Sequence, residues 1–239
     1  MFYTVIERSD GFGAQFQTMI CCILIVENDG DKYVHMPIKM MEHNYDNDSN
    51  FISNAENCMN LINNYDCIND NINVNILDIW SIINKFESNI NYYLNSESLK
   101  NIKRCFWKNK NKNFFNNDKI NIGVHIRRPN SNDNRIEGTD TPLQYYFDVI
   151  NRIKQKYYDK DLLFHIYSQN DISDYDTFDK TNIMFHLNEN LFDTFIGLVA
   201  SDILITSASS LSYSAAILSD GEIYYKPFWH TPGNKWIIC

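Results

Sequence analysis

The chain has 239 residues, of which 44% are hydrophobic and 14% aromatic, and its formal net charge is −9. This length allows one large α/β domain or two small lobes, and the hydrophobic content excludes a mainly disordered protein. The acidic balance argues against general nucleic-acid binding, which requires a basic face.

The sequence shows no pattern typical of a membrane helix, a signal peptide or paired cysteines. No run approaches the roughly 20 apolar residues of a membrane helix, the longest being residues 19–26. Residues 1–6 lack the basic start of a signal peptide and indicate a strand instead. The six cysteines show neither CxxC pairs nor zinc-like spacing. We therefore expect a cytoplasmic protein with reduced thiols and no transmembrane segment.

The first forty residues predict a strand–helix–strand opening. Residues 2–6 and 32–37 have the pattern of strands, and residues 16–27 form an apolar run typical of a helix. Between the first strand and the helix lies a glycine-containing turn, Asp10–Gln15. This order is that of a βαβ unit.

The middle of the chain is rich in Asn and Asp and is harder to assign. Residues 44–75 predict an irregular helical region with long loops, and residues 76–94 predict a helix. Residues 100–119 carry many lysines, which favours a solvated linker between two lobes.

A second α/β unit begins at Ile120, directly after the linker. Its predicted strands are residues 119–124, 162–167, 182–185, 203–206 and 223–225, and its predicted helices are residues 143–158, 191–200 and 210–218. Alternation of this kind predicts a parallel sheet.

The predicted elements together indicate an α/β protein with two Rossmann-like lobes and mainly parallel sheets. Residues 1–115 would form a reduced N-terminal lobe on the acceptor side, and residues 116–225 the second, ligand-binding lobe. Residues 226–239 would be a final segment that can cross back to the first lobe.

Three loops that follow predicted strands carry residues suited to a phosphorylated ligand. Asp10–Gln15 holds two glycines, which let a backbone approach a ligand beside the free N–H groups of a helix start. His125–Asn130 places two arginines after a strand, and guanidinium groups pair with phosphate oxygens. Ser207–Tyr213 brings a cluster of serines to a helix start. Each loop has an ordinary alternative: a tight turn, a surface ion pair and a helix cap.

In this order the three loops resemble elements of the fucosyltransferases that act in α1,2 and α1,6 linkage, a superfamily of GT-B-like architecture. Gly11–Gln15 is similar to the family's Gly-x-Gly-x-Gln element, and His125–Arg128 to its His-x-Arg-Arg motif. Residues 203–218 resemble its strand that ends in Ser-Ser and a helix. The resemblance covers residues 1–40 and 120–230, and residues 44–118 do not share it.

The resemblance implies a site for a GDP-sugar, in which Arg127 contacts the β-phosphate and acts in catalysis. Arg128 and the N–H groups of Ser209 and Ser210 would assist it, and His125 and Asp193 would contact the guanine or support its pocket. The remaining positions that the resemblance implies as donor-binding are Gly11, Gly13, Gln15 and Tyr146, with Glu137 as a further position on the donor side. The chain departs from the family at Asn130, where an aspartate is usual.

The implied reaction is transfer of fucose from GDP-fucose to a glycan hydroxyl, with inversion at the anomeric carbon. Arginines and helix N–H groups would stabilise the charge that grows on the leaving diphosphate. A carboxylate would deprotonate the acceptor, and the candidates are Asp10 and Glu137. We expect no metal and no cofactor besides the donor, because the Asp-x-Asp matches at 46–48 and 174–176 have the composition of surface loops.

Two other functions are compatible with the same residues. Arginines and serines recognise phosphate rather than sugar, so another nucleotide-deoxyhexose could be the donor. The domain could also bind nucleotide sugars or glycans without catalysis. In each case the expected partners are a nucleotide sugar and a glycan or glycoconjugate, with no nucleic acid.

Overall fold

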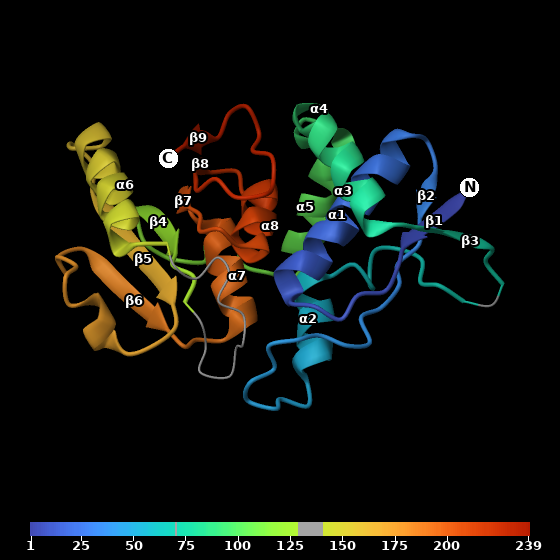
Figure 1. Ribbon diagram of the computed structural model, residues 1–239, viewed down its shortest axis with the longest axis horizontal. Coiled ribbons are helices and arrows are strands. Elements are labelled where there is room, and N and C mark those ends of the chain that lie inside the picture. Colours follow the sequence, from blue (N-terminus) through green and yellow to red (C-terminus); the bar gives the residue numbers. More distant parts are fainter. Residues whose placement is uncertain (70, 129–140) are drawn as a thin grey trace. The chain divides into compact units, whose positions relative to one another are not determined.

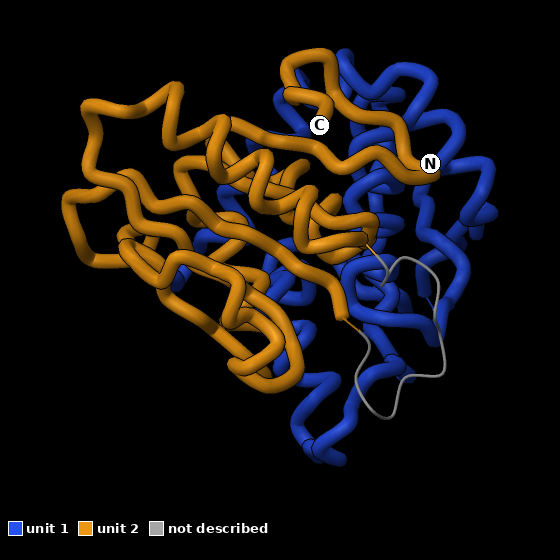
Figure 2. Tube along the Cα trace, turned by 60° about the vertical axis from the view of Figure 1, so that its left-hand side comes forward, with its two compact units in different colours: residues 1–111 blue, residues 112–239 orange. Residues whose placement is uncertain are grey.

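The computed structural model describes residues 1–69, 71–128 and 141–239. The chain divides into two compact units, Met1–Asn111 and Lys112–Cys239, each with its own parallel sheet (Figures 1 and 2). The prediction of an α/β protein with two mainly parallel sheets and a smaller N-terminal one is confirmed.

The first unit has a three-stranded parallel sheet in the order β2-β1-β3. The strands are β1 (Phe2–Val5), β2 (Lys32–Tyr33) and β3 (Val74–Leu77). The helices are α1 (Phe12–Asn28), α2 (Phe51–Met59), α3 (Ile79–Ser88), α4 (Ile90–Leu94) and α5 (Glu97–Trp107). Most of α1 is buried, because it contacts the sheet as well as α3 and α5, which explains why its sequence is apolar on all sides.

The second unit has a six-stranded parallel sheet in the order β6-β5-β4-β7-β8-β9. Its strands are β4 (Ile120–His125), β5 (Leu162–Ser168), β6 (Ile183–Leu187), β7 (Ile203–Ile205), β8 (Glu222–Tyr225) and β9 (Ile237–Ile238). Its helices are α6 (Leu143–Lys156), α7 (Leu191–Ala200) and α8 (Ser210–Leu218), with a short 3-10 helix η1 (Ile172–Tyr175). This is the strand order of a doubly wound Rossmann sheet. Starting from β4, the chain adds strands first on one side, up to β6, and then on the other side, beginning with β7.

The first unit corrects several sequence-based assignments. The expected helix 76–94 is wrong at its start, because Ile76 and Leu77 complete β3 and Asp78 then caps α3 by accepting from the Ser81 N–H (2.9 Å). Asn89 separates α3 from α4. α1 begins at Phe12, four residues earlier than expected.

The first part of the basic segment 100–119 is helical, as α5 runs to Trp107, and the remainder contains the change from one unit to the other. Leu99, Ile102 and Phe106 are buried along one side of α5, and the basic side chains occupy its other side. Lys100 and Arg104 both pair with Glu97 on that solvated face. The change of unit comes at Asn111 and Lys112.

The last segment belongs to the second unit. Residues 226–239 were expected to be able to cross back to the first lobe, but β9 pairs in parallel with β8, through Tyr224 with Ile237 and Tyr225 with Ile238. Across the described residues, no helix combines the length and the apolar character that spanning a bilayer requires.

Candidate functional site

The most organised polar cluster lies where the order of the second sheet reverses. β4 ends at His125 and the neighbouring β7 ends at Ile205, so the loops that follow both strands leave the same edge of the sheet. In open α/β sheets this switch point is the usual ligand position. The structure thus brings together two of the three predicted loops.

A buried hydrogen bond joins these loops. Ser207 Oγ lies 2.9 Å from His125 Nδ1, although the two residues are 82 positions apart in the chain. Burial and the neighbouring charge of Arg127 lower the pKa of His125 to about 3. The imidazole is therefore neutral at ordinary pH and can act as a hydrogen-bonding group without adding charge.

The serine loop is closed on itself before α8 begins. The Ser207 N–H donates to Ser212 Oγ (3.2 Å), and both side chains are fully buried. Ser209 caps α8 by accepting from the Leu211 N–H (3.2 Å). Ser210 is the first helical residue and accepts through its carbonyl from Ser214 Oγ (2.7 Å). The rigid loop presents the N-terminus of α8, where backbone N–H groups and the helix dipole favour an anion.

The arginine pair divides into two different environments. Arg128 Nη1 donates to the carbonyls of Arg127 (2.9 Å) and Thr141 (3.1 Å), so this guanidinium braces the loop against the start of α6. Both arginines are half-buried. Glu137, the predicted donor-side carboxylate, and Asn130 lie outside the described residues.

Two further predicted donor positions lie in other surroundings. Tyr146 is on α6 and has no exposed surface, since it forms part of the hydrophobic core, where burial raises its pKa. Asp193 is exposed in the first turn of α7, and its N–H donates to Asn190 Oδ1 (3.3 Å). Tyr146 is therefore placed for packing, while Asp193 is open to solvent.

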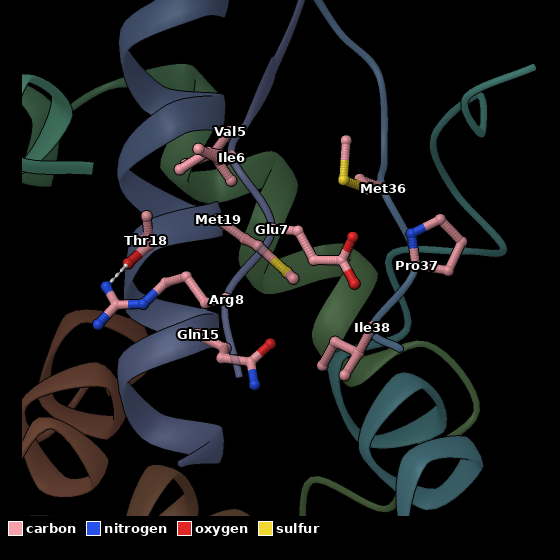
Figure 3. Close-up of a pocket in the computed structure, with 10 residues that line it drawn as sticks. All are labelled: Val5, Ile6, Glu7, Arg8, Gln15, Thr18, Met19, Met36, Pro37 and Ile38. Carbon is pink, nitrogen blue, oxygen red and sulfur yellow. Dashed lines mark hydrogen bonds between the residues drawn. The ribbon is translucent and has the colours of Figure 1, made fainter. Parts of the chain in front are cut away.

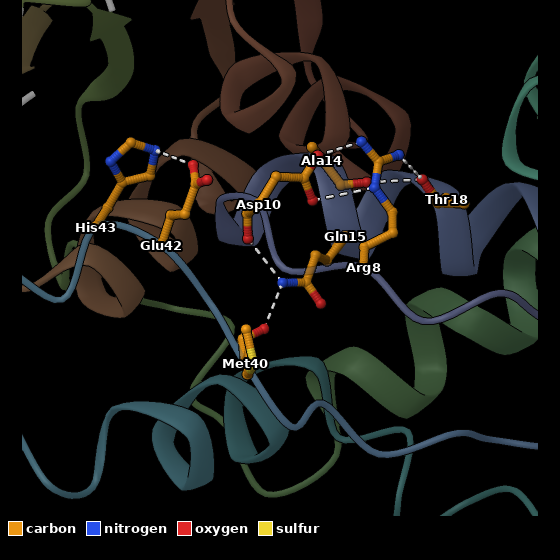
Figure 4. A network of polar contacts seen from close by, with 8 residues as sticks. All are labelled: Arg8, Asp10, Ala14, Gln15, Thr18, Met40, Glu42 and His43. Carbon is orange, nitrogen blue, oxygen red and sulfur yellow. Dashed lines mark hydrogen bonds and ion pairs between the residues drawn. The ribbon is translucent and has the colours of Figure 1, made fainter. Parts of the chain in front are cut away.

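The glycine loop belongs to the first unit, where it is held by neighbouring side chains (Figure 4). Gln15 Nε2 donates to the carbonyls of Asp10 (2.7 Å) and Met40 (2.9 Å). Gly11 accommodates His43, because a Cβ at Gly11 would lie 2.8 Å from His43 Cδ2. Gly13, within α1, is buried. Close packing against neighbouring residues therefore explains why glycines occupy these two positions.

Arg8 is a residue that the sequence analysis missed. Its guanidinium pairs with both carboxylate oxygens of Asp10 and donates to Thr18 Oγ1 (2.7 Å). Asp10, a predicted catalytic base, is thus engaged on both oxygens by an arginine. An Arg two residues before an Asp in a strand-to-helix turn is the signal that could have indicated this pair.

The two Asp-x-Asp matches lie in surface segments. Asp48 accepts from the Asn50 N–H (2.8 Å) and from Asn54 Nδ2 (3.2 Å), at the start of α2. Asp176 pairs with Lys180 (3.0 Å). Within the described part of the chain, no three His, Cys, Asp or Glu side chains are grouped so that they could hold a metal ion.

Comparisons with known proteins give only distant likenesses, all among solved structures. No family model and no curated protein matches the chain. Among solved structures, the E. coli heptosyltransferase WaaC with ADP-2-deoxy-2-fluoro heptose is similar over 100% of this chain and 93% of that chain, at 11% identity and a TM-score of 0.45. At this distance the likeness concerns the general course of the fold, and no residue role is taken from it.

Proposed function

We propose that the protein is a glycosyltransferase that binds the diphosphate of a nucleotide sugar at the switch point of its second unit. The observation that carries this proposal is the 2.9 Å contact between His125 and Ser207, which ties the arginine loop to the serine loop beside the start of α8. Loops after adjacent parallel strands, an arginine pair and a helix N-terminus together favour a diphosphate.

The chemistry of group transfer agrees with these residues. The acceptor oxygen forms a bond to the anomeric carbon while the bond from that carbon to the β-phosphate oxygen breaks, so negative charge grows on the departing nucleoside diphosphate. Arg127 and the Ser210 N–H supply preorganised donors for this charge, whereas the Ser209 N–H, also implied by the resemblance, already donates to the Ser207 carbonyl (2.9 Å). The neutral His125 keeps the loops in register without competing with the arginines for the anion.

We further propose fucose from GDP-fucose as the donor, a glycan hydroxyl as the acceptor, and an inverting, metal-independent reaction. The motif resemblance of residues 11–15, 125–128 and 203–218 supports this assignment. Asp10 and Glu137 remain the two proposed bases, and the pairing of Asp10 with Arg8 favours a role in holding the loop for that carboxylate.

The test compares donors and one arginine variant. Thermal-shift measurements across GDP-, UDP-, ADP- and dTDP-sugars should show stabilisation by GDP-fucose, since a ligand that binds the folded state stabilises it by mass action. Arg127→Ala should lower transfer roughly a hundredfold or more, the usual cost of losing one preorganised donor to a developing charge. Arg152→Ala, on the exposed face of α6, is the matched control and should leave both readouts unchanged.

Other outcomes separate the alternatives. Stabilisation by a different nucleotide sugar would replace the donor and keep the enzyme class. Binding without transfer to any acceptor would make the protein a non-catalytic nucleotide-sugar domain. If no nucleotide sugar binds, or if Arg127→Ala binds and transfers as the wild type does, the proposed function is wrong. Loss of transfer with EDTA would contradict metal independence.

A further inference from the structure

The first unit contains a pocket at the carboxyl end of its sheet (Figure 3). Three segments line it: the end of β1 with residues 6–8, one face of α1, and residues 36–38 after β2. Its empty space is about 310 Å³ when the part that is open solvent is counted in. The carboxyl ends of parallel strands are where α/β sheets hold ligands, so the pocket occupies a functional position within this unit.

The floor of the pocket is apolar and its polar groups are hydrogen-bond acceptors. Val5, Met19 and Ile38 are each less than a tenth exposed. Gln15 is 2% exposed, and its Nε2 is committed to two carbonyls, which fixes the direction of the amide. Within the described part of the chain, Gln15 Oε1 receives no hydrogen bond, and it faces the pocket (Figure 3). An acceptor on a buried side chain that opens into a cavity can take its hydrogen bond there from a ligand or from water.

Glu7 provides the second acceptor. Its carboxylate points towards the segment 36–38 across the pocket (Figure 3), and Lys39 Nζ lies 3.0 Å from its Oε2. The Glu7 side chain is 39% exposed, at the rim. Because Lys39 neutralises this carboxylate, the charge offered to a ligand is small, which favours a neutral donor such as a hydroxyl over an ammonium group.

The arginine in the wall does not make the pocket an anion site. Arg8 directs its guanidinium away from the cavity, towards Thr18 and Asp10, and contributes the apolar part of its side chain to the wall (Figures 3 and 4). An anionic ligand would face acceptor oxygens from Glu7 and Gln15, which repel it.

The wall opposite α1 is held in place from below. Glu56 Oε1 accepts from the Ile38 N–H (2.7 Å), and Glu56 Oε2 lies 2.9 Å from His35 Nε2. Both side chains are buried. The segment that carries Met36 and Ile38 is therefore preorganised, as a ligand pocket requires.

We infer that this pocket binds a neutral ring alcohol, whose hydroxyl groups donate to Glu7 and Gln15 Oε1 while a C–H face of the ring contacts Met19 and Ile38. An aliphatic ligand would leave the buried Gln15 oxygen without a donor, and a polyol without a C–H face would not cover the apolar floor. Taking this ligand to be the acceptor of the transfer rests on the proposed function, whereas the binding itself does not.

Methionine methyl groups give a direct readout on the intact protein. With 13C-methyl methionine labelling, methyl pyranosides of glucose, galactose and mannose are titrated, and the spectra are assigned by single Met→Leu variants. Met19 and Met36 line the pocket, whereas Met59 on α2 and Met184 on β6 do not. The inference expects saturable shifts at Met19 and Met36 with at least one pyranoside, and unmoved signals at Met59 and Met184.

Variants and competing probes make the result decisive. Glu7→Gln should weaken binding roughly tenfold, as expected when a charged acceptor is lost. Glu42→Gln, the same change on a neighbouring loop position that does not line the pocket, should leave it unchanged. The inference is overturned if no pyranoside shifts both methyl groups, if Glu7→Gln binds as well as the wild type, or if cyclohexylammonium or cyclohexanecarboxylate binds more tightly.

The two proposals fail separately in this design. The titration is run without nucleotide sugar, so pyranoside shifts in a protein that binds no nucleotide sugar would uphold the pocket and refute the glycosyltransferase. Donor binding and transfer without shifts at Met19 and Met36 would uphold the enzyme and refute the pocket.

Discussion

The carboxyl edges of the two sheets present opposite chemistry to a ligand. In the second unit, the loops that follow β4 and β7 carry two arginines and the N-terminus of α8 beside a neutral His125, so the groups at this edge are hydrogen-bond donors. In the first unit, Glu7 and Gln15 Oε1 face an apolar floor, so this edge offers acceptors. An arginine is present at both edges, but Arg8 is committed to Asp10 and Thr18. Because the Arg8 guanidinium is turned towards Asp10 and Thr18, its charge is not directed into the pocket of the first edge.

The largest effect is expected when the buried carboxylate that supports the pocket of the first unit is removed. Glu56→Ala removes the only acceptor that the described residues offer to the Ile38 N–H, and also the partner of His35 Nε2, while His35 Nδ1 keeps its contact with the Tyr33 hydroxyl. Leaving these buried groups unpaired should lower the free energy of unfolding by about 3 kcal/mol, measured by urea denaturation.

Its control is an exposed carboxylate in the same unit. Glu97→Ala, which breaks pairs with Lys100 and Arg104 on the surface of α5, should cost less than about 1 kcal/mol. Glu56→Ala should also abolish the pyranoside shifts at Met19 and Met36. Equal stability losses in the two variants would contradict the role given to Glu56.

Much of the second unit could be predicted from the sequence, for a physical reason. Strands buried on both faces leave continuous apolar runs, as in Ile203–Ile205, and helices between them keep a clear period. Because parallel strands end at one edge, the sequence also predicts that the loops after Val124 and Thr206 approach each other, and the contact of His125 with Ser207 agrees with this.

The first unit was less predictable because its contacts depend on distant residues. β3 has four residues, of which Asn75 and Ile76 are exposed, so the alternation of a half-buried strand is missing. The Gln15 amide is fixed by the Met40 carbonyl, 25 residues away. A local pattern carries no information about such a partner. In α5, the buried stripe of Leu99, Ile102 and Phe106 was available as a signal, but the surrounding lysines and asparagines obscured it.

The second largest effect is a pH dependence of stability. It is expected from two buried histidines in the second unit. Burial and Arg127 lower the pKa of His125 from 6.5 to about 3, and burial and His186 lower that of His165 to about 4. Between pH 6.5 and these values the unfolded chain takes up protons that the folded chain does not bind. Acidification from pH 7 to pH 5 should therefore cost roughly 1–2 kcal/mol from His125 and about the same from His165, because both folded-state pKa values lie below this range.

Urea unfolding at a series of pH values measures this slope. His125→Asn keeps a hydrogen-bonding side chain and removes the titrating ring, so it should flatten the acid slope by the His125 share. Above pH 7 these two histidines should contribute no pH dependence to the stability, because both are neutral in the folded and in the unfolded chain. A wild-type stability that does not change between pH 7 and pH 5 would contradict the assignment of a neutral, buried His125.

The smallest effect is expected from removing a helix cap, and it shows whether the cap of α8 also contributes to donor binding. Ser209 Oγ accepts from the Leu211 N–H at the start of α8, and Ser96 Oγ accepts from the Leu99 N–H at the start of α5, both at 3.2 Å. Either Ser→Ala change should lower stability by about 1 kcal/mol, the usual cost of losing a cap. If α8 holds the diphosphate, Ser209→Ala should in addition weaken GDP-fucose binding several-fold in a thermal-shift titration, because the loop that orients the N–H donors loosens. Ser96→Ala has the same stability cost in the other unit and should not change donor affinity. If both variants change donor affinity equally, Ser209 acts only as a helix cap, and donor binding in the second unit depends on Arg127 and its loop.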